Sequence, residues 1–130
     1  FMPRLASVYA KMLGEKISKH NTAVYLINTG WSGGPYGVGK RIKIEYSRAM
    51  VTAVINGSLD IVKFSHNDLF NLDVPTECPG VPSEVLEPRN TWVDKDSYDL
   101  SAKKLAQMFV DNFKKFKDVS EEIRSAGPKL

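Results

Sequence analysis

The residues that could do chemistry most directly lie in a glycine-rich stretch in the first third of the chain. The run Gly34-Pro35-Tyr36-Gly37-Val38-Gly39-Lys40 matches the first seven positions of the phosphate-binding loop G-x-x-x-x-G-K-[ST], and a short apolar run precedes it. In that loop, backbone N–H groups and the lysine bind phosphate oxygens, and the last hydroxyl ligates Mg²⁺. The match makes phosphate binding the first hypothesis to weigh.

Three features of the same stretch argue against a phosphate-binding loop. The eighth position is Arg41, so the hydroxyl that would ligate Mg²⁺ is missing. Residues 41–46 alternate polar and apolar, as a strand does, whereas a phosphate loop opens a helix. Pro35 removes one backbone donor. The glycines could equally serve only to supply unusual backbone angles, although a loop of this length with Trp31 and Tyr36 favours a function.

The other titratable or nucleophilic residues do not form a constellation. His20 and His66 lie far apart in the sequence without neighbouring ligands, so we interpret both as surface residues. Glu84 and Glu87 are spaced like a pair on one helix face but have no acid–base partner. Cys78 has no histidine or helix start nearby that would lower its pKa. We therefore predict no catalytic residue and no metal ligand in this chain.

The composition is that of an ordinary globular protein. Of the 130 residues, 42% are hydrophobic and 25% are charged, enough for one modest core and a single unit over residues 1–130. No apolar run approaches the roughly 18 residues of a membrane span, and a net charge of +3 without a dense basic stripe does not indicate nucleic-acid binding. The single cysteine excludes an internal disulfide and fits a reducing compartment. Because the chain begins at Phe1, we expect a fragment or a processed chain.

The periodicity of the apolar residues indicates a mixed α/β unit. Helices are predicted over residues 3–19, 48–55, 96–117 and 120–126, and strands over residues 23–27, 41–46 (or a hairpin arm) and 69–74. Ser47 is expected to cap the second helix, which should be well buried, and Asn56-Gly57 should end it. The third helix should bury a stripe made of Leu105, Met108, Phe109, Asn112, Phe113 and Phe116. Residues 59–91 should be mostly irregular, with four prolines that wrap the chain over a larger body.

A series of short blocks, in order along nearly the whole chain, resembles one protein family. The blocks are Asn28-Thr29-Gly30-Trp31, Gly37-Val38-Gly39-Lys40-Arg41-Ile42, Ser47-Arg48-Ala49, Phe70-Asn71-Leu72, Val74-Pro75-Thr76, Pro79-Gly80-Val81, Pro88-Arg89-Asn90-Thr91, Phe109-Val110-Asp111-Asn112-Phe113 and Ala126-Gly127-Pro128-Lys129-Leu130. Together they are similar to the C-terminal part of ATP-dependent phosphoenolpyruvate carboxykinases. Nine short matches in the right order are far more specific than any single motif.

The resemblance implies a fold, a reaction and a location. The fold would be the C-terminal portion of the carboxykinase nucleotide-binding domain. The family converts oxaloacetate and ATP to phosphoenolpyruvate, carbon dioxide and ADP, with Mg²⁺ and Mn²⁺, in the cytoplasm, at the entry to gluconeogenesis. Its phosphate loop, metal ligands and substrate-binding residues lie upstream of the region that this chain resembles.

The resemblance also implies three nucleotide contacts. The family's Arg-Ile pair falls on Arg41 and Ile42, where a guanidinium can stack on a purine face and an aliphatic side chain can pack against it. The family's nucleotide-binding hydroxyl falls on Ser47, a position where threonine is common in the family. Without the resemblance, Arg41 would be interpreted as a solvated charge and Ser47 as a helix cap.

Two functional hypotheses follow from the sequence. In the first, the chain is part of a carboxykinase, with the remainder of that chain and ATP as its partners; oxaloacetate then binds only the missing part, and no nucleic acid or membrane is involved. These 130 residues alone are then expected to be inactive and not to bind ATP tightly, because they lack a complete phosphate loop and metal ligands. In the second, the chain is a self-standing module whose basic glycine loop binds nucleotide or RNA. It lacks the aromatic motifs of common RNA-binding modules.

Overall fold

The computed structural model describes residues 3–130, and it confirms a mixed α/β fold. In chain order the described elements are α1 Ala6–His20, β1 Trp31–Ser32, β2 Lys40–Arg41, α2 Ile44–Ile55, β3 Phe64–Asn67, β4 Leu72–Pro75, α3 Ser83–Leu86, α4 Pro88–Thr91, α5 Lys95–Phe113 and α6 Glu121–Ser125. The strands form two separate antiparallel hairpins, β1–β2 and β3–β4. Helices therefore supply most of the regular structure, and each sheet is only two strands wide.

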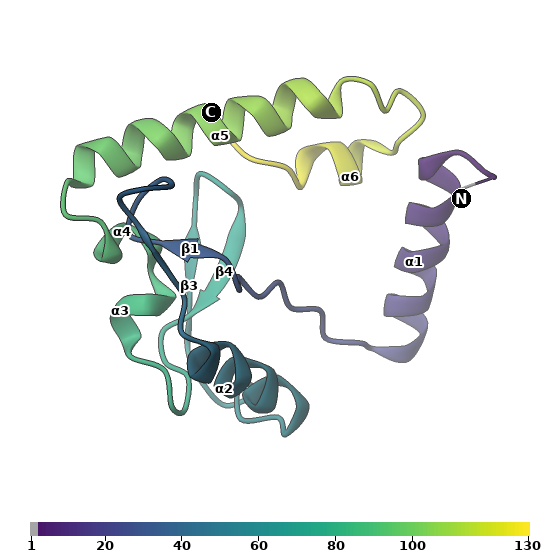
Figure 1. The fold of residues 1–130 in the computed structure, drawn as a ribbon. Helices are drawn as coiled ribbons and strands as arrows, with labels where there is room; N and C mark the ends of the chain where they lie inside the picture. Colours follow the sequence, from purple (N-terminus) through teal and green to yellow (C-terminus); the bar gives the residue numbers. More distant parts are fainter. Residues whose placement is uncertain (1–2) are drawn as a thin grey trace.

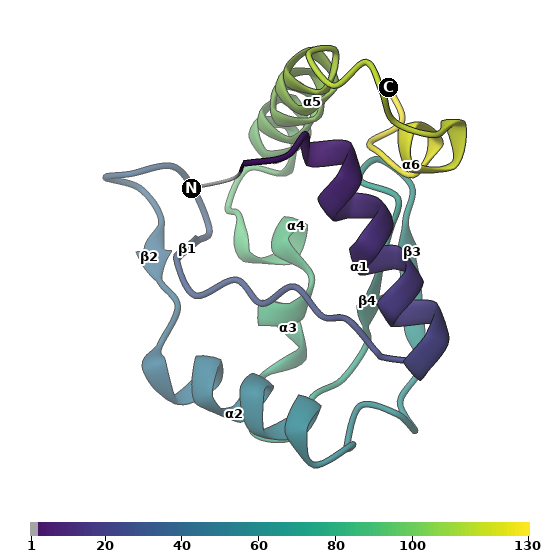
Figure 2. The same ribbon diagram turned by 90° about the vertical axis from the view of Figure 1, so that its right-hand side faces the viewer.

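The elements surround an open centre. α5 runs along one side of the molecule and α2 lies at the opposite side, with the two hairpins and the short helices α3 and α4 between them (Figures 1 and 2). α1 stands apart and is joined to this body by the extended residues 22–30. The C-terminal tail returns to the tip of the β3–β4 hairpin, where the Lys129 N–H donates to the Leu69 carbonyl at 2.9 Å and the Asn71 side chain donates to the Ala126 carbonyl at 3.1 Å.

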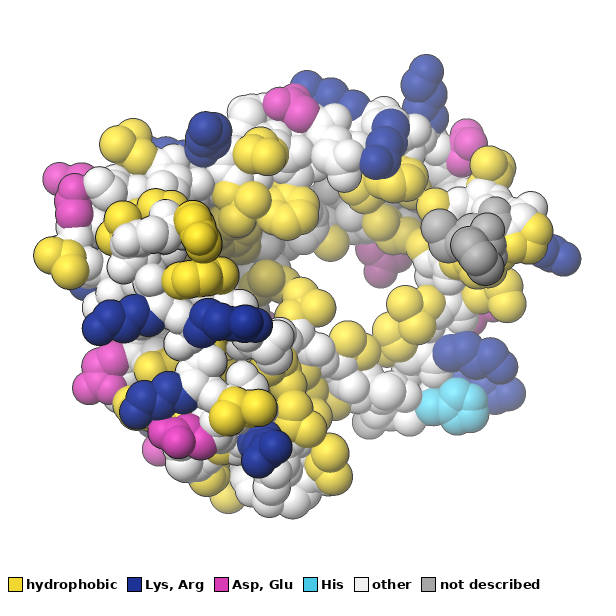
Figure 3. Space-filling model, viewed as in Figure 1, with side chains coloured by type: hydrophobic (Ala, Val, Ile, Leu, Met, Phe, Trp, Pro, Cys, Tyr) yellow, Lys and Arg dark blue, Asp and Glu magenta, His cyan; other side chains and the backbone are white. Residues whose placement is uncertain are grey.

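The buried core is small for a chain of this length. Four buried residues form one cluster, Ala53, Leu59, Cys78 and Val81, against which residues of α2 and α3 pack. The accessible surface of the chain is 10089 Å², whereas a compact monomer of this size exposes about 6,900 Å². Figure 3 shows the cause: a hollow passes through the middle of the molecule, and hydrophobic side chains gather around it.

The helix predictions that rest on local signals are confirmed. α1 ends at His20, and the next residue, Asn21, adopts the left-handed conformation with a φ of 48°, as expected for a helix stop at this position. Gly57, with a φ of 74°, follows α2 in the same manner. α6 begins at Ser120, whose hydroxyl accepts a hydrogen bond from the Ile123 N–H at 3.4 Å. α5 begins at Lys95 and ends at Phe113, four residues before the predicted end.

One strand prediction is wrong, and the prediction of a strand or hairpin arm over residues 41–46 is correct only at Arg41. Residues 23–27 are extended but pair with no strand in the described part of the chain. The predicted strand over residues 41–46 ends at Arg41, and α2 begins at Ile44. Its partner β1 is only two residues long, so beyond Arg41 one further bond remains, from the Ile42 N–H to the Gly30 carbonyl at 2.9 Å. The first N–H groups to bond within the helix are those of Tyr46 and Ser47, which both donate to the Lys43 carbonyl.

The early start of α2 also overturns the predicted cap. Ser47 lies inside the helix, where its N–H donates to the Lys43 carbonyl at 3.2 Å, and Lys43 occupies the N-cap position without a side-chain hydrogen bond. Only Ala53 of α2 is buried, and Ile55 is 79% exposed, so the expectation of a well-buried helix is also wrong for this chain. Both deviations follow from the narrow hairpin and the open centre beside the helix.

Further differences lie in the second half of the chain. β3 was not predicted, because residues 59–91 were expected to be mostly irregular, and β4 starts at Leu72 rather than at residue 69. Asn71 has a φ of 54° and belongs to the turn. The stripe predicted for α5 is half-exposed at Leu105, Met108 and Phe109, while Ala102 and Ala106 are the buried positions. α5 therefore packs against the rest of the described chain through its small residues, Ala102 and Ala106.

Candidate functional site

The glycine loop is the turn of the β1–β2 hairpin. Trp31 pairs with Arg41 and Ser32 pairs with Lys40, and the loop folds back through hydrogen bonds from the Val38 and Gly39 N–H groups to the Pro35 carbonyl at 3.0 and 2.9 Å. A Cβ at Gly39 would meet the Gly34 carbonyl oxygen and would lie 2.7 Å from that of Ser32. Only glycine fits this position, so the loop geometry depends on it.

This geometry excludes a phosphate-binding loop of the kind that the motif suggests. Lys40 lies in β2, and the helix that follows starts four residues later at Ile44. A phosphate loop requires the lysine to open a helix whose N-terminal N–H groups face the phosphates. The sequence-based objection to the motif is therefore confirmed by the position of Lys40 in a strand.

The three predicted nucleotide contacts occupy different environments. Arg41 is exposed on β2 and makes no ion pair with the described residues 3–130. Ile42 is partly buried and lines the large central cavity. Ser47 is partly buried on α2 and is not among the residues that line this cavity. The structure thus brings Ile42 alone to the cavity wall, and nucleotide contact by all three residues stays a prediction.

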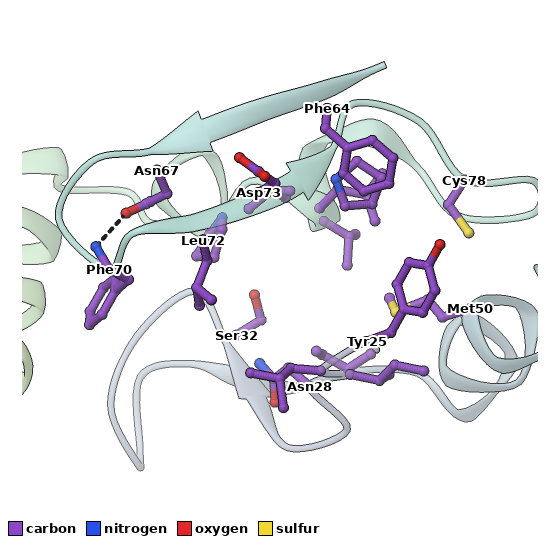
Figure 4. Close-up of a pocket in the computed structure, with 18 of the residues that line it drawn as sticks. Tyr25, Asn28, Ser32, Met50, Phe64, Asn67, Phe70, Leu72, Asp73 and Cys78 are labelled. Carbon is purple, nitrogen blue, oxygen red and sulfur yellow. Dashed lines mark hydrogen bonds between the residues drawn. The ribbon is translucent and has the colours of Figure 1, made fainter. Parts of the chain in front are cut away.

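The central cavity has a volume of about 1110 Å³ and a mostly apolar lining. Figure 4 shows Tyr25, Asn28 and Ser32 on one side of it, the β3–β4 hairpin with Phe64 and Leu72 on the other, and Met50 and Cys78 at one end. Small-molecule pockets usually hold about 300–1,000 Å³. This cavity lies just above that range, and its apolar lining suits packed protein better than a single small ligand.

One wall of the cavity contains a polypeptide segment with unused backbone groups. Residues 23–28 run along it in an extended conformation, and Leu26 in this segment is 84% exposed. Extended backbone normally satisfies its N–H and C=O groups by pairing with a neighbouring strand. The segment therefore has the composition and conformation of a strand, and the described part of the chain contains no partner for it.

The side of the molecule opposite α2 contains a polar network between α4 and α5. Arg89 donates to both carboxylate oxygens of Asp99, at 2.9 and 3.0 Å. The Lys95 ammonium donates to the carbonyls of Arg89, Asn90 and Trp92, at 2.9, 3.0 and 2.8 Å. The hydrogen bonds from Arg89 lower the pKa of Asp99. This network holds the short helix α4 in one position against the start of α5.

The titratable residues Cys78 and His66 lie in different environments. Cys78 is 5% exposed, and its burial raises the pKa of the thiol, so the thiolate needed for nucleophilic attack is disfavoured. The His66 ring lies 2.8 Å from the Asp73 carboxylate, across the β3–β4 pair. Among residues 3–130, no three His, Cys, Asp or Glu side chains are placed to hold a metal ion. No helix in this described range is long and apolar enough to cross a membrane.

Comparison with known proteins identifies the family. A family model described as phosphoenolpyruvate carboxykinase matches residues 1–84. The chain is 63% identical over 129 residues to phosphoenolpyruvate carboxykinase (ATP) of Caldanaerobacter subterraneus subsp. tengcongensis, covering 99% of this chain and 25% of the relative. It is 61% identical over 130 residues to the same-named protein of Fusobacterium nucleatum subsp. nucleatum, covering 99% and 25%.

A third relative gives the same result. Phosphoenolpyruvate carboxykinase (ATP) 2 of Moorella thermoacetica is 58% identical over 128 residues, covering 98% of this chain and 24% of the relative. The chain therefore belongs to the phosphoenolpyruvate carboxykinase family, and the relatives that it matches are members named for ATP. It spans about a quarter of the length of these relatives.

Sequence reasoning did not find the contacts around α4. The block Pro88-Arg89-Asn90-Thr91 was recognised only as part of the resemblance, and Lys95 and Asp99 received no role. The available signal was the spacing of Arg89 and Asp99 on either side of Asp94, which caps α5 by accepting hydrogen bonds from the Asp96 and Ser97 N–H groups. The cap marks where α5 begins, but no local pattern pairs Arg89 with Asp99.

Proposed function

We propose that this chain is the C-terminal part of an ATP-dependent phosphoenolpyruvate carboxykinase and contributes contacts to the adenine nucleotide. The complete protein would convert oxaloacetate and ATP to phosphoenolpyruvate, carbon dioxide and ADP, in the cytoplasm and in gluconeogenesis. The observation that carries the proposal is the 63% identity, over 99% of this chain, to a relative named phosphoenolpyruvate carboxykinase (ATP). Residues 1–130 would form one unit within the nucleotide-binding domain of that protein.

The nucleotide contacts proposed are Arg41, Ile42 and Ser47. Arg41 is exposed and without an ion-pair partner in residues 3–130, so its guanidinium is available to stack on a purine. Ile42 is held in place by the bond from its N–H to the Gly30 carbonyl, and it can pack on the same base. Ser47 does not cap α2, which leaves its hydroxyl for a ligand.

The chemistry of phosphoryl transfer would come from outside this chain. ATP supplies the phosphoryl group when bound, and the family also uses divalent metal ions. The described residues do not fit a metal site, since no cluster of three suitable side chains exists among residues 3–130. We propose that the isolated 130 residues are inactive and bind ATP weakly.

The partner proposed for this chain is the remainder of the carboxykinase polypeptide. The relatives are about four times as long as this chain, so protein is available in them to fill the cavity. The unpaired extended residues 23–28 and the surface excess of about 3,200 Å² over a compact monomer support the same partner. Such an area is in the range of a large, permanent interface.

The nucleotide role is tested by replacing Arg41 with alanine in the complete carboxykinase. We expect the Michaelis constant for ATP to rise about fivefold or more, because a lost cation–π stack costs on the order of 1 kcal/mol, with a smaller change for oxaloacetate. Lys40→Ala is the matched control, because it removes the same charge from the adjacent strand position, whose side chain points to the other face. An unchanged constant for ATP, with a damaged one for oxaloacetate, would contradict the assignment.

A further inference from the structure

Two polar side chains from distant parts of the chain join the glycine loop to α4. The Ser32 hydroxyl donates a hydrogen bond to the Thr91 hydroxyl oxygen at 3.0 Å, across 59 residues of sequence. The Thr91 hydroxyl in turn donates to the Pro88 carbonyl at 2.7 Å. In these two hydrogen bonds Ser32 donates, Thr91 both accepts and donates, and the Pro88 carbonyl accepts. The bond between Ser32 and Thr91 is partly buried, which makes it stronger than the same bond in water.

A second observation places the loop against the same residue. Gly33 has a φ of 81°, and a Cβ built on it would lie 2.9 Å from the Thr91 carbonyl oxygen. A real Cβ does not approach a backbone oxygen so closely, so a side chain here would push the loop away from α4. The hydroxyl of Thr91 thus faces Ser32, and the carbonyl of Thr91 faces the next residue, Gly33.

α4 is itself a fixed support for this contact. Arg89 is bound to Asp99 through two hydrogen bonds, and Lys95 binds three carbonyls at the end of α4. Trp92, the next residue after Thr91, packs edge-on against Tyr98 with ring centroids 5.7 Å apart. Thr91 therefore lies on the part of α4 that is tied most closely to α5.

The other end of the contact is the strand pair that contains the proposed nucleotide residues. Ser32 pairs with Lys40, and its neighbour Trp31 pairs with Arg41. The hairpin is only two pairs long, so its own ladder gives it little rigidity. A hairpin this short needs an external contact to hold it in one orientation.

We propose that Thr91 is a positioning residue for the nucleotide contacts: its hydroxyl and carbonyl hold Ser32 and Gly33 on α4 and thereby set the position of Arg41 and Ile42. This inference rests on the proposed function. Thr91 does not touch the nucleotide; it acts through the hairpin. Loss of the hydroxyl loosens the hairpin and weakens nucleotide binding without removing any contact group.

The test uses four variants of the complete carboxykinase. Thr91→Val keeps the shape of the side chain and removes the hydroxyl, and Thr91→Ser keeps the hydroxyl. Gly33→Ala places a Cβ against the Thr91 carbonyl, and Gly37→Ala is its matched control, because Gly37 has a similar φ of 87° with nothing within 4 Å of its Cβ. Each glycine variant therefore carries a similar backbone strain, and only the first disturbs the contact with α4.

Two measurements are made on each variant. Hydrogen exchange of the nucleotide-free protein reports the mobility of residues 32–39, and calorimetry reports the dissociation constant of Mg-ATP. We expect Thr91→Val and Gly33→Ala to accelerate exchange in the loop and raise the dissociation constant, each about fivefold, the effect of losing one net hydrogen bond. Thr91→Ser and Gly37→Ala should stay within about twofold of the parent in both measurements. Exchange around Ala102 and Ala106 on α5 should not change.

The outcomes separate this inference from the proposed function. If Arg41→Ala weakens Mg-ATP binding but Thr91→Val and Gly33→Ala do not, the positioning role is refuted and the proposed function stands. If Arg41→Ala has no effect on Mg-ATP binding, both are overturned. Faster exchange in α5 as well as in the loop of Thr91→Val would show general destabilisation, and it too would refute a specific positioning role.

Discussion

Replacing Leu26 by alanine should destabilise the complete carboxykinase by about 2–5 kcal/mol, the usual cost of truncating a buried leucine. The side chain is 84% exposed in this chain, and substitutions at exposed positions usually change stability by less than about 0.5 kcal/mol. The prediction depends on residues 23–28 being covered by the remainder of the protein. The loss of stability expected for a buried Leu26 is several times the loss expected for an exposed Leu26, so one measurement of unfolding free energy separates the two cases.

The magnitude follows from the surface that this chain leaves open. Its accessible area exceeds that of a compact monomer by about 3,200 Å², and Leu26 lies on the wall of the central cavity. Full burial of a leucine side chain contributes about 1.5–3 kcal/mol by transfer, and the void left by truncation adds a further term. Backbone pairing of the extended segment would hold the side chain in that buried position.

The assay is chemical denaturation of the complete protein and its variants. Leu59→Ala serves as the positive control, because Leu59 is 4% exposed and already belongs to the core of this chain. We expect the two variants to lose similar stability. A loss below about 0.5 kcal/mol for Leu26→Ala, with a normal loss for Leu59→Ala, would show that the segment stays exposed and would refute the reasoning.

Two further predictions concern binding and pH. Calorimetry of the isolated 130 residues with Mg-ATP should detect no micromolar binding, and these residues should show no measurable carboxykinase turnover. Micromolar binding or measurable turnover would place the catalytic groups within this chain. Arg89 lowers the pKa of Asp99 in the folded state, so the ion pair stabilises the fold above the ordinary pKa of aspartate and this contribution is lost as the pH falls through the lowered value. Asp99→Asn should therefore flatten the acid side of a plot of denaturation midpoint against pH, and an unaltered acid side would show that the pair contributes nothing.

Elements with local signals could be predicted from the sequence. α1 and α6 have periodic or capping residues within a few positions of their ends, Asn21 and Ser120 being examples. The lack of a hydroxyl residue at position 41 was also visible locally, and it correctly argued against a phosphate-binding loop, since Lys40 lies in β2. Such features depend on neighbouring residues only, so they survive in any context that the rest of the protein provides.

Elements that depend on distant partners could not be predicted in the same way. The apolar run at residues 23–27 has the composition of a strand, but strand pairing requires a second segment, which the described chain lacks. β3 was missed because Ser65, His66 and Asn67 are polar, and the turn at Asn71 was the only local sign of a hairpin. The contact between Ser32 and Thr91 spans 59 residues and has no sequence signature.

The buried thiol of Cys78 makes the core of this chain open to observation. It is the only cysteine in the 130 residues, it sits among Ala53, Leu59 and Val81, and it also borders the central cavity (Figure 4). Because Cys78 is 5% exposed and its burial raises the pKa of the thiol, a thiol reagent should label it slowly in the folded chain and faster when this region opens. The rate at which Cys78 is labelled would therefore report how often α2 separates from the segment around Val81. No reporter group has to be introduced.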